Sequence, residues 1–323
     1  MNTLTHRLKM TLLGNQWVFL LAVVIILSVI AGVVNPRYFT VRNMSNLLEQ
    51  IAVLGLVACG ATILIVSGNF DISVGANIGL SASVMAVLMR SGVPPFAAAG
   101  IGLVVAIGAA TFIGGCSIAF HAPSFIISLA SIGVFQGIAL ALTGGTLQTI
   151  YGQFEALGGT RVFDIIPVIF LISLVGFLAT HSMLTHTQLG RRVYAIGNNA
   201  RAAFLAGIRV NANRMIFFFL NGLLVGVAAM LLLSRVGAAQ PTTGSGIELQ
   251  AIGSAVVGGT PMSGGRGKII GTFFGVLLWG VIANALNMMR VDPYFQDIIF
   301  GLLIVLAVAV SSLRLRIQQS LMA

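Results

Sequence analysis

Apolar segments about as long as a bilayer is thick follow one another along almost the whole chain. A helix needs about 20 mostly apolar residues to cross the hydrocarbon core, and the sequence offers about ten such windows between short polar connections. The windows lie at residues 17–34, 46–67, 72–90, 96–119, 124–143, 165–183, 214–234, 248–263, 269–289 and 294–311. Only 7% of the residues are charged, against roughly 25% in a soluble domain. The sequence therefore predicts an all-α, polytopic membrane helical bundle forming one transmembrane domain over residues 1–323.

The most one-sided cluster of charge lies in a polar stretch near the middle of the chain, residues 185–214. It contains no Asp or Glu, and its arginines are Arg191, Arg192, Arg201, Arg209 and Arg214. The positive-inside rule places this stretch in the cytoplasm. Residues 201–208 have helix-forming composition, follow the cap-competent pair 198–199 and end on Gly207. They predict a short helix along the membrane surface.

The other basic residues support a topology with both termini in the cytoplasm. On the cytoplasmic side this topology adds Arg7, Lys9, Arg266, Lys268, Arg314 and Arg316 to the central arginines. Fewer lie outside, namely Arg37, Arg42, Arg90, Arg161, Arg235 and Arg290. The bias fits the positive-inside rule. Because these charges are scattered between apolar runs, we expect them to set topology, and no nucleic-acid partner is predicted.

Two pairs of segments indicate an internal repeat. SGNFDISVGANIG at 67–79 is answered by GSGIELQAIG at 244–253, and the apolar run at 121–135 by the run at 290–305, each opening near a Pro. An odd number of spans separates the copies, which predicts an inverted-topology repeat of the kind found in transporters. The halves run over about 46–143 and 214–311. A chance likeness of two helix connections is the alternative.

Two acidic residues stand where the repeated segments enter their apolar spans. Asp71 can cap the next helix, and Ser245-x-x-Glu248 reads as a capping box. The functional reading is that these helix starts turn polar groups toward a path for a hydroxyl-rich solute. The two readings are compatible. The candidate path residues are Asn69, Phe70, Asp71, Ser73, Asn77, Glu248, Gln250, Thr260 and Ser263.

No motif in the chain predicts catalysis or metal binding. The Gly-rich run 258–268 resembles a phosphate loop superficially, but Lys268 is followed by Ile269 where the P-loop needs Ser or Thr. The histidines have no carboxylate or cysteine at ligand spacing. Titratable residues deep within the spans, which ion coupling usually requires, are nearly missing. We therefore predict a protein that is not an enzyme and draws its energy from another subunit.

Several long motifs together resemble a known family. They are SGNFDISVG (67–75), TQLGRRVYAIGNNARAAFLAGI (187–208), QPTTGSGIELQAIGSAVVGGTPMSGGRGKIIGT (240–272) and NALNMMRVDPYFQDIIFGLLIVLAV (284–308). From about residue 35 to the C-terminus, the chain resembles the permease subunits of bacterial monosaccharide ABC importers, the ribose, xylose and arabinose group.

The resemblance implies a type II importer-like fold of about ten helices, multi-pass in the bacterial inner membrane. It also implies a second permease subunit, identical or similar, and a periplasmic or surface sugar-binding protein. The ATP-binding cassette subunits would hold Mg-ATP, so no cofactor is expected in this chain.

The resemblance further implies that the loop 184–213 docks on the ATPase. The matching residues are Leu189, Gly190, Arg191, Arg192, Tyr194, Asn198, Asn199, Ala202, Ala203 and Gly207. Importer permeases carry an EAA-x3-G motif in this loop, and here Arg201 stands where that motif has Glu. The expected function is monosaccharide or polyol uptake by alternating access. Alternatives are a stand-alone ion-coupled transporter, which would depend on Asp71 or Glu248, and a passive facilitator active without partners.

Overall fold

The computed structural model describes the chain over residues 16–322. Its helices are α2 (Gln16–Val34), α3 (Val41–Val66), α4 (Val74–Arg90), α5 (Pro95–Ala119), α6 (Ser124–Thr143), α7 (Glu155–Gly159), α8 (Val168–His186), α9 (Gln188–Asn198), α10 (Ala200–Leu205), α11 (Val210–Val236), α12 (Ile247–Val257), α13 (Ile269–Met288) and α14 (Pro293–Met322). The strand β1 (Gln148–Thr149) pairs antiparallel with β4 (Ala238–Ala239), and β2 (Arg161–Val162) pairs with β3 (Ile166–Pro167). The predicted all-α bundle is confirmed. Arg7 and Lys9, and the side chains of Arg314 and Arg316, lie outside the described residues.

Every predicted apolar window contains a helix. Within the described residues, 7 helices are long and apolar enough to cross a membrane, and α4, α12 and Pro293–Leu306 of α14 are shorter apolar helices. The predicted window 248–263 is longer than the helix that it contains, since α12 ends at Val257 after 11 residues. Gly259 adopts φ +97° and Pro261 follows, and neither residue continues a helix. This short helix fits the half-helix expected for a transporter repeat.

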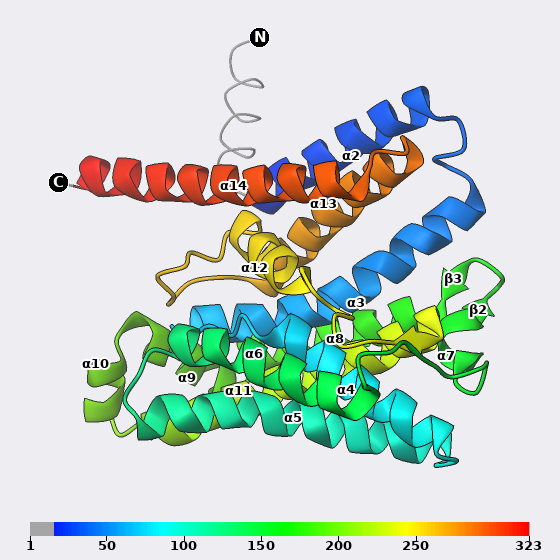
Figure 1. Ribbon diagram of the computed structural model, residues 1–323. Helices are drawn as coiled ribbons and strands as arrows, with labels where there is room; N and C mark the ends of the chain where they lie inside the picture. Colours follow the sequence, from blue (N-terminus) through cyan, green and yellow to red (C-terminus); the bar gives the residue numbers. More distant parts are fainter. Residues whose placement is uncertain (1–15, 323) are drawn as a thin grey trace, which may run out of the picture.

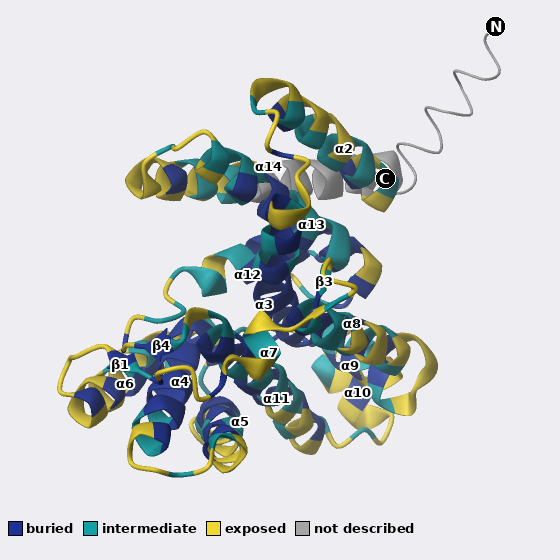
Figure 2. Cartoon of the chain, turned by 90° about the vertical axis from the view of Figure 1, so that its right-hand side faces the viewer, coloured by how far each residue is buried: buried dark blue, intermediate teal, exposed yellow. Residues whose placement is uncertain are grey.

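The two ends of the bundle carry different structures. Helices α9 and α10 lie at one end, and α7 with strands β2 and β3 at the other (Figure 1). Viewed from the α7 end, α3 stands among the surrounding helices, while α2 and α14 lie together at one side (Figure 2). The order of elements over α3–α6 recurs over α11–α14: a long helix, a break, a shorter helix and two further helices. This order suits the inverted repeat, which stays a prediction.

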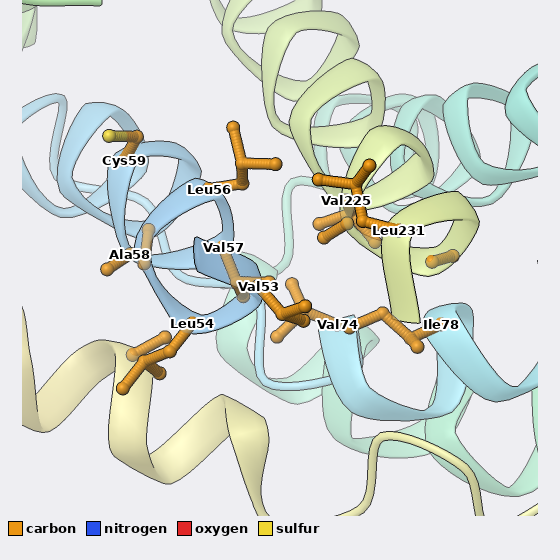
Figure 3. Packing of buried hydrophobic residues seen from close by; sticks show 14 of the residues in the cluster. Val53, Leu54, Leu56, Val57, Ala58, Cys59, Val74, Ile78, Val225 and Leu231 are labelled. Carbon is orange, nitrogen blue, oxygen red and sulfur yellow. The ribbon is translucent and has the colours of Figure 1, made fainter. Parts of the chain in front are cut away.

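Helix α3 is the centre of the packing. Its apolar window is 94% buried, so it faces protein on all sides, as expected of a helix that is apolar all round. Its Val53 and Val57 lie beside Val74 of α4 and Val225 of α11 (Figure 3). Helices α8, α12 and α13 also pack against it. A movement of α3 would therefore displace helices of both predicted halves.

Glycines let α5 and α11 pack closely. A Cβ at Gly222 would lie 2.7 Å from the Ile107 Cα and 2.9 Å from the Ala106 carbonyl oxygen. A Cβ at Gly226, one turn on, would lie 2.6 Å from Leu103 Cδ1. Small residues at such spacing allow backbones in lipid to approach and gain van der Waals contact. The α5–α11 pair is thus fixed at close range.

Gly222→Ala should separate α5 from α11, because the added methyl meets backbone atoms that cannot yield as a flexible side chain could. The expected cost is about 1–3 kcal/mol of overpacking, measured as a lower melting temperature of the purified protein in detergent. Gly108→Ala on α5 is the matched control, since a Cβ there has nothing within 4 Å. Equal melting temperatures for the two variants would contradict this packing.

Candidate functional site

The first break lies between α3 and α4. Gly68 adopts φ +76°, and the backbone then runs without regular secondary structure beside the start of α6. The Phe70 amide donates to Ser124 Oγ (2.9 Å), and the Ile72 amide donates to Ser128 Oγ (3.2 Å). Irregular backbone at membrane depth is tolerated only where its polar groups are bonded. The two serines, one turn apart on α6, supply acceptors for this break.

Asp71 joins the first break to α11. It is 4% exposed, and its Oδ1 accepts from the Ser73 amide (2.9 Å) and the Ser73 hydroxyl (2.7 Å). Its Oδ2 accepts from Asn221 Nδ2 of α11 (3.0 Å). Asp71 was expected to cap α4, but Ser73 is the N-cap residue. The carboxylate instead holds Ser73 in place and fastens the break to the middle of α11.

The second break, between α11 and α12, folds back along α4. A Cβ at Gly75 would overlap Glu248 Oε2 and lie 2.6 Å from the Gly244 carbonyl oxygen. A Cβ at Gly79, one turn on, would overlap the Pro241 carbonyl oxygen. The two glycines thus form a groove on α4 for the second break. The first turns of α4 bring the two breaks together.

Glu248 does not form the predicted capping box with Ser245. The N-cap of α12 is Gly246, whose φ of +87° is a conformation that Ser rarely adopts. Glu248 Oε1 accepts from the Gly246 amide (3.1 Å), while its buried Oε2 has no hydrogen-bond partner among the described residues. The Glu248 carboxylate therefore lies at the contact between the two breaks, and only one of its oxygens accepts a hydrogen bond in the described part of the chain.

The remaining path candidates divide into two groups. Asn69 is buried and bonds back to Ser67, which keeps it at the first break, and half-buried Phe70 lies beside it. Asn77 instead donates to the Ala106 carbonyl of α5 (3.0 Å). Thr260 and Ser263 lie in the loop between α12 and α13, Thr260 buried and Ser263 exposed. The structure therefore places Asn69, Phe70, Asp71 and Ser73 at the first break and Glu248 at the second, with Gln250 in the first turn of α12. Asn77, Thr260 and Ser263 are part of neither break.

The polar stretch forms two helices where one was predicted. Thr187 caps α9 by accepting from the Gly190 amide (3.1 Å), and Asn199 caps α10 by accepting from the Ala202 amide (2.9 Å). The predicted helix over 201–208 is wrong at its end, since α10 stops at Leu205. Gly207 has φ +84°, a conformation that terminates helices. The preceding helix, α9, was not predicted.

The predicted coupling residues lie on α9, on α10 and in the turns beside them. Arg191, Arg192, Asn198, Asn199, Ala202 and Gly207 are exposed. Leu189 and Tyr194 are half-buried, and Gly190 and Ala203 are buried. Phe204 and Leu205 of α10 are also exposed, at 58% and 73%. This exposed face combines guanidinium groups with apolar side chains.

The inner face of α9 is bonded to the α12–α13 loop, which in turn is bonded to the end of α3. Tyr194 Oη donates to the Gly267 carbonyl (2.9 Å), and Asn198 Nδ2 donates to the Gly265 carbonyl (3.1 Å). The Gly265 amide in turn donates to the Val66 carbonyl at the end of α3 (2.8 Å). Burial raises the pKa of Tyr194, so the phenol stays protonated and donates at physiological pH. Helix α9 is thus attached to the α12–α13 loop and, through it, to α3.

Three charged side chains form an ion triad at the α7 end, and the sequence did not predict it. Glu49 of α3 accepts from Arg161 of β2 (3.3 Å) and from Arg235 of α11 (3.2 Å). Glu49 is 7% exposed, and such a buried carboxylate requires partners. Glu49 is a lone acid within an apolar window, and this feature of the sequence could have predicted a buried partner. The same holds for Asn221, an amide in the middle of an apolar span.

Comparisons with known proteins agree on one family. A family model described as branched-chain amino acid transport system / permease component matches residues 43–308. The ribose import permease protein of Bacillus subtilis (strain 168) is 39% identical over 287 residues, covering 88% of this chain and 88% of its own. The D-allose transport system permease protein of Escherichia coli (strain K12) is 38% identical over 301 residues, covering 91% and 90%. The autoinducer 2 import system permease protein of Yersinia enterocolitica is 32% identical over 297 residues, covering 92% and 82%. No solved structure matches the chain.

Asn221→Ala should destabilise the protein, because Asp71 Oδ2 loses its donor inside the bundle. An unpaired buried group costs about 1–3 kcal/mol, and more when it is charged, so the melting temperature should fall by several degrees. Asn211→Ala is the matched control, since Asn211 is an exposed amide on the same helix. If both variants melt like the wild type, the Asp71–Asn221 bond does not hold the break.

Proposed function

Because the chain belongs to the family of branched-chain amino acid transport system permease components, we propose that it is the membrane-spanning subunit of an ATP-binding cassette importer for a monosaccharide or related polyol. The family description names amino acids, whereas the similar relatives are named for ribose, D-allose and autoinducer 2. Their names support sugar uptake. They favour this function over an ion-coupled secondary transporter or a passive facilitator.

The observation that carries the proposed mechanism is the attachment of α9 to the α12–α13 loop and, through that loop, to the end of α3. A partner ATPase that binds Mg-ATP and closes would press on the exposed face of α9 and α10. Through Tyr194 and Asn198 the force reaches the loop at Gly265–Gly267, and through Val66 it reaches the first break. The breaks meet on α4, where helix interruptions allow hinge motion. The chain itself performs no chemistry and supplies alternating access.

The proposed assembly follows from the two ends of the bundle. The α9–α10 end would be cytoplasmic, since its exposed arginines follow the positive-inside rule, and both termini would share that side. The α7 end would face a periplasmic or surface sugar-binding protein. A second permease subunit, identical or similar, would complete the path. The setting would be the bacterial inner membrane.

The charge-reversed double variant Arg191→Glu/Arg192→Glu should lose its ATPase partner. We expect co-purification of the ATP-binding subunit from native membranes, and uptake by cells, to fall by about tenfold or more, because exposed guanidinium groups that bond an acidic surface become repulsive. Arg37→Glu/Arg42→Glu is the matched control at the α7 end, because Arg37 in the α2–α3 connection and Arg42 in the first turn of α3 are both exposed. Unchanged co-purification and uptake in Arg191→Glu/Arg192→Glu would contradict the docking role of α9.

Gly197→Ala should leave the docking of the ATPase intact but weaken the transmission of its movement from α9 to α3. A Cβ at Gly197 would overlap the Val66 carbonyl oxygen and lie 2.9 Å from the Gly265 amide nitrogen, so the added methyl must push α9 away from α3. The ATPase should still co-purify, while uptake falls by several-fold, since misplaced contacts commonly cost about 1–3 kcal/mol. Gly159→Ala, with open space at its Cβ, is the control. Wild-type uptake by Gly197→Ala would contradict the route through Val66.

A further inference from the structure

A cavity of about 180 Å³ lies between α3, α11, α12 and α13, apart from the contact of the two breaks. Its polar lining is Gln50, Arg235 and Gln250, and the rest is aliphatic except for Trp279. Gln50 belongs to the early part of α3 and Arg235 to the last turn of α11. Both positions are at the α7 end, opposite α9 and α10. The cavity thus lies on the side from which a solute would enter.

The two glutamine side chains have no hydrogen-bond partner among the described residues. Each primary amide offers two donors and a carbonyl acceptor, a set that matches a hydroxyl group, which both donates and accepts. They come from different predicted halves, Gln50 from α3 and Gln250 from α12. Arg235 adds donors, and its charge is partly offset by Glu49, which accepts from its Nε (3.2 Å) and is shared with Arg161. The lining therefore combines three polar side chains with a mainly apolar wall.

Trp279 borders the cavity but is almost fully covered by protein. It is 2% exposed and is held by a stacked contact with Phe300 of α14, with ring centroids 5.2 Å apart. Its buried Nε1 has no acceptor among the described residues, although a buried indole N–H usually finds one. The Trp279 indole N–H is therefore a further buried donor at a residue that lines the cavity.

We propose that this cavity is a binding site for the hydroxyl-rich solute on its way through the membrane, with Gln50 and Gln250 bonding its hydroxyls next to Trp279. The site takes neutral monosaccharides or polyols. No carboxylate lines it, which disfavours a metal ion, and an apolar ligand would leave both amides unbonded. This inference rests on the proposed uptake function and deepens it.

The location links the site to the second break. Ile247 and Gln250 both line the cavity and lie in the first turn of α12, directly after the turn at Gly246. A rotation of α12 about this break would move Gln250 relative to Gln50 on α3. The two glutamines would therefore face each other in one state of the alternating-access cycle and be separated in the other. Such a change would lower the affinity of the site for the solute and allow its release.

The test measures uptake of D-ribose and of D-allose, each radiolabelled, by cells that hold the whole transporter. Gln50→Ala and Gln250→Ala should each lower uptake at sub-saturating sugar by about tenfold, while ATPase co-purification stays at the wild-type level. Gln153→Ala, which removes an exposed amide at the α7 end, is the matched control and should transport normally. Gln250→Asn keeps the amide but shortens its reach, and it should retain more uptake than Gln250→Ala.

A second measurement uses Trp279 as a reporter. The chain has only two tryptophans, so Trp17→Phe leaves Trp279 as the sole source of indole fluorescence. Titration with whichever of the two sugars the wild type takes up should change this emission saturably, and Gln250→Ala should weaken the response. Wild-type uptake in both glutamine-to-alanine variants, or an unresponsive Trp279 in a protein that transports, would overturn this site and leave the importer function standing. If the wild type neither takes up a sugar nor binds an ATPase, the importer function fails, and this site fails with it.

Discussion

Backbone hydrogen bonding inside a bilayer is the constraint on which this structure depends. An amide or carbonyl without a partner costs several kcal/mol in hydrocarbon, so a helix can be interrupted there only where side chains replace its lost bonds. Ser124 and Ser128 do this for the break after α3, and Asp71 adds a bond to Asn221 of α11. The break is therefore possible only because α6 and α11 lie against it. The contacts that stabilise the fold at this break are also the ones on which the proposed hinge would depend.

The second break relies on shape more than on polar partners. Its backbone fits against Gly75 and Gly79 of α4, where any Cβ would collide with it. The first break is thus held by directional bonds and the second by close packing around Glu248. Because both meet on the first turns of α4, a displacement of one is transmitted to the other. Helix α9 adds the connection to the surface through Tyr194 and Asn198.

Much of the architecture could be predicted from the sequence, because spanning helices depend on local composition. Each apolar window became a helix, and the short Gly-rich window became the short α12. The errors concern contacts between distant residues. Asp71 and Ser245 have the local chemistry of caps, yet Ser73 and Gly246 occupy those positions, because tertiary contacts and a positive φ decide the outcome. The pairs Asp71–Asn221 and Glu49–Arg235 join residues 150 and 186 positions apart, and no local pattern specifies such a partner. The inverted repeat and the roles of the path residues stay predictions.

The brevity of α12 has a consequence for the energy of passage. At 1.5 Å per residue its 11 residues cover about 16 Å, whereas the hydrocarbon core is about 30 Å thick. A helix of this length cannot cross the core, so in a bilayer at least one of its flanking segments, the turn at Gly246 or the glycine-rich loop 258–268, must lie within it. Polar backbone there would shorten the low-dielectric barrier along this element. For the proposed hydroxylated solute, a shorter barrier would lower the electrostatic work of crossing.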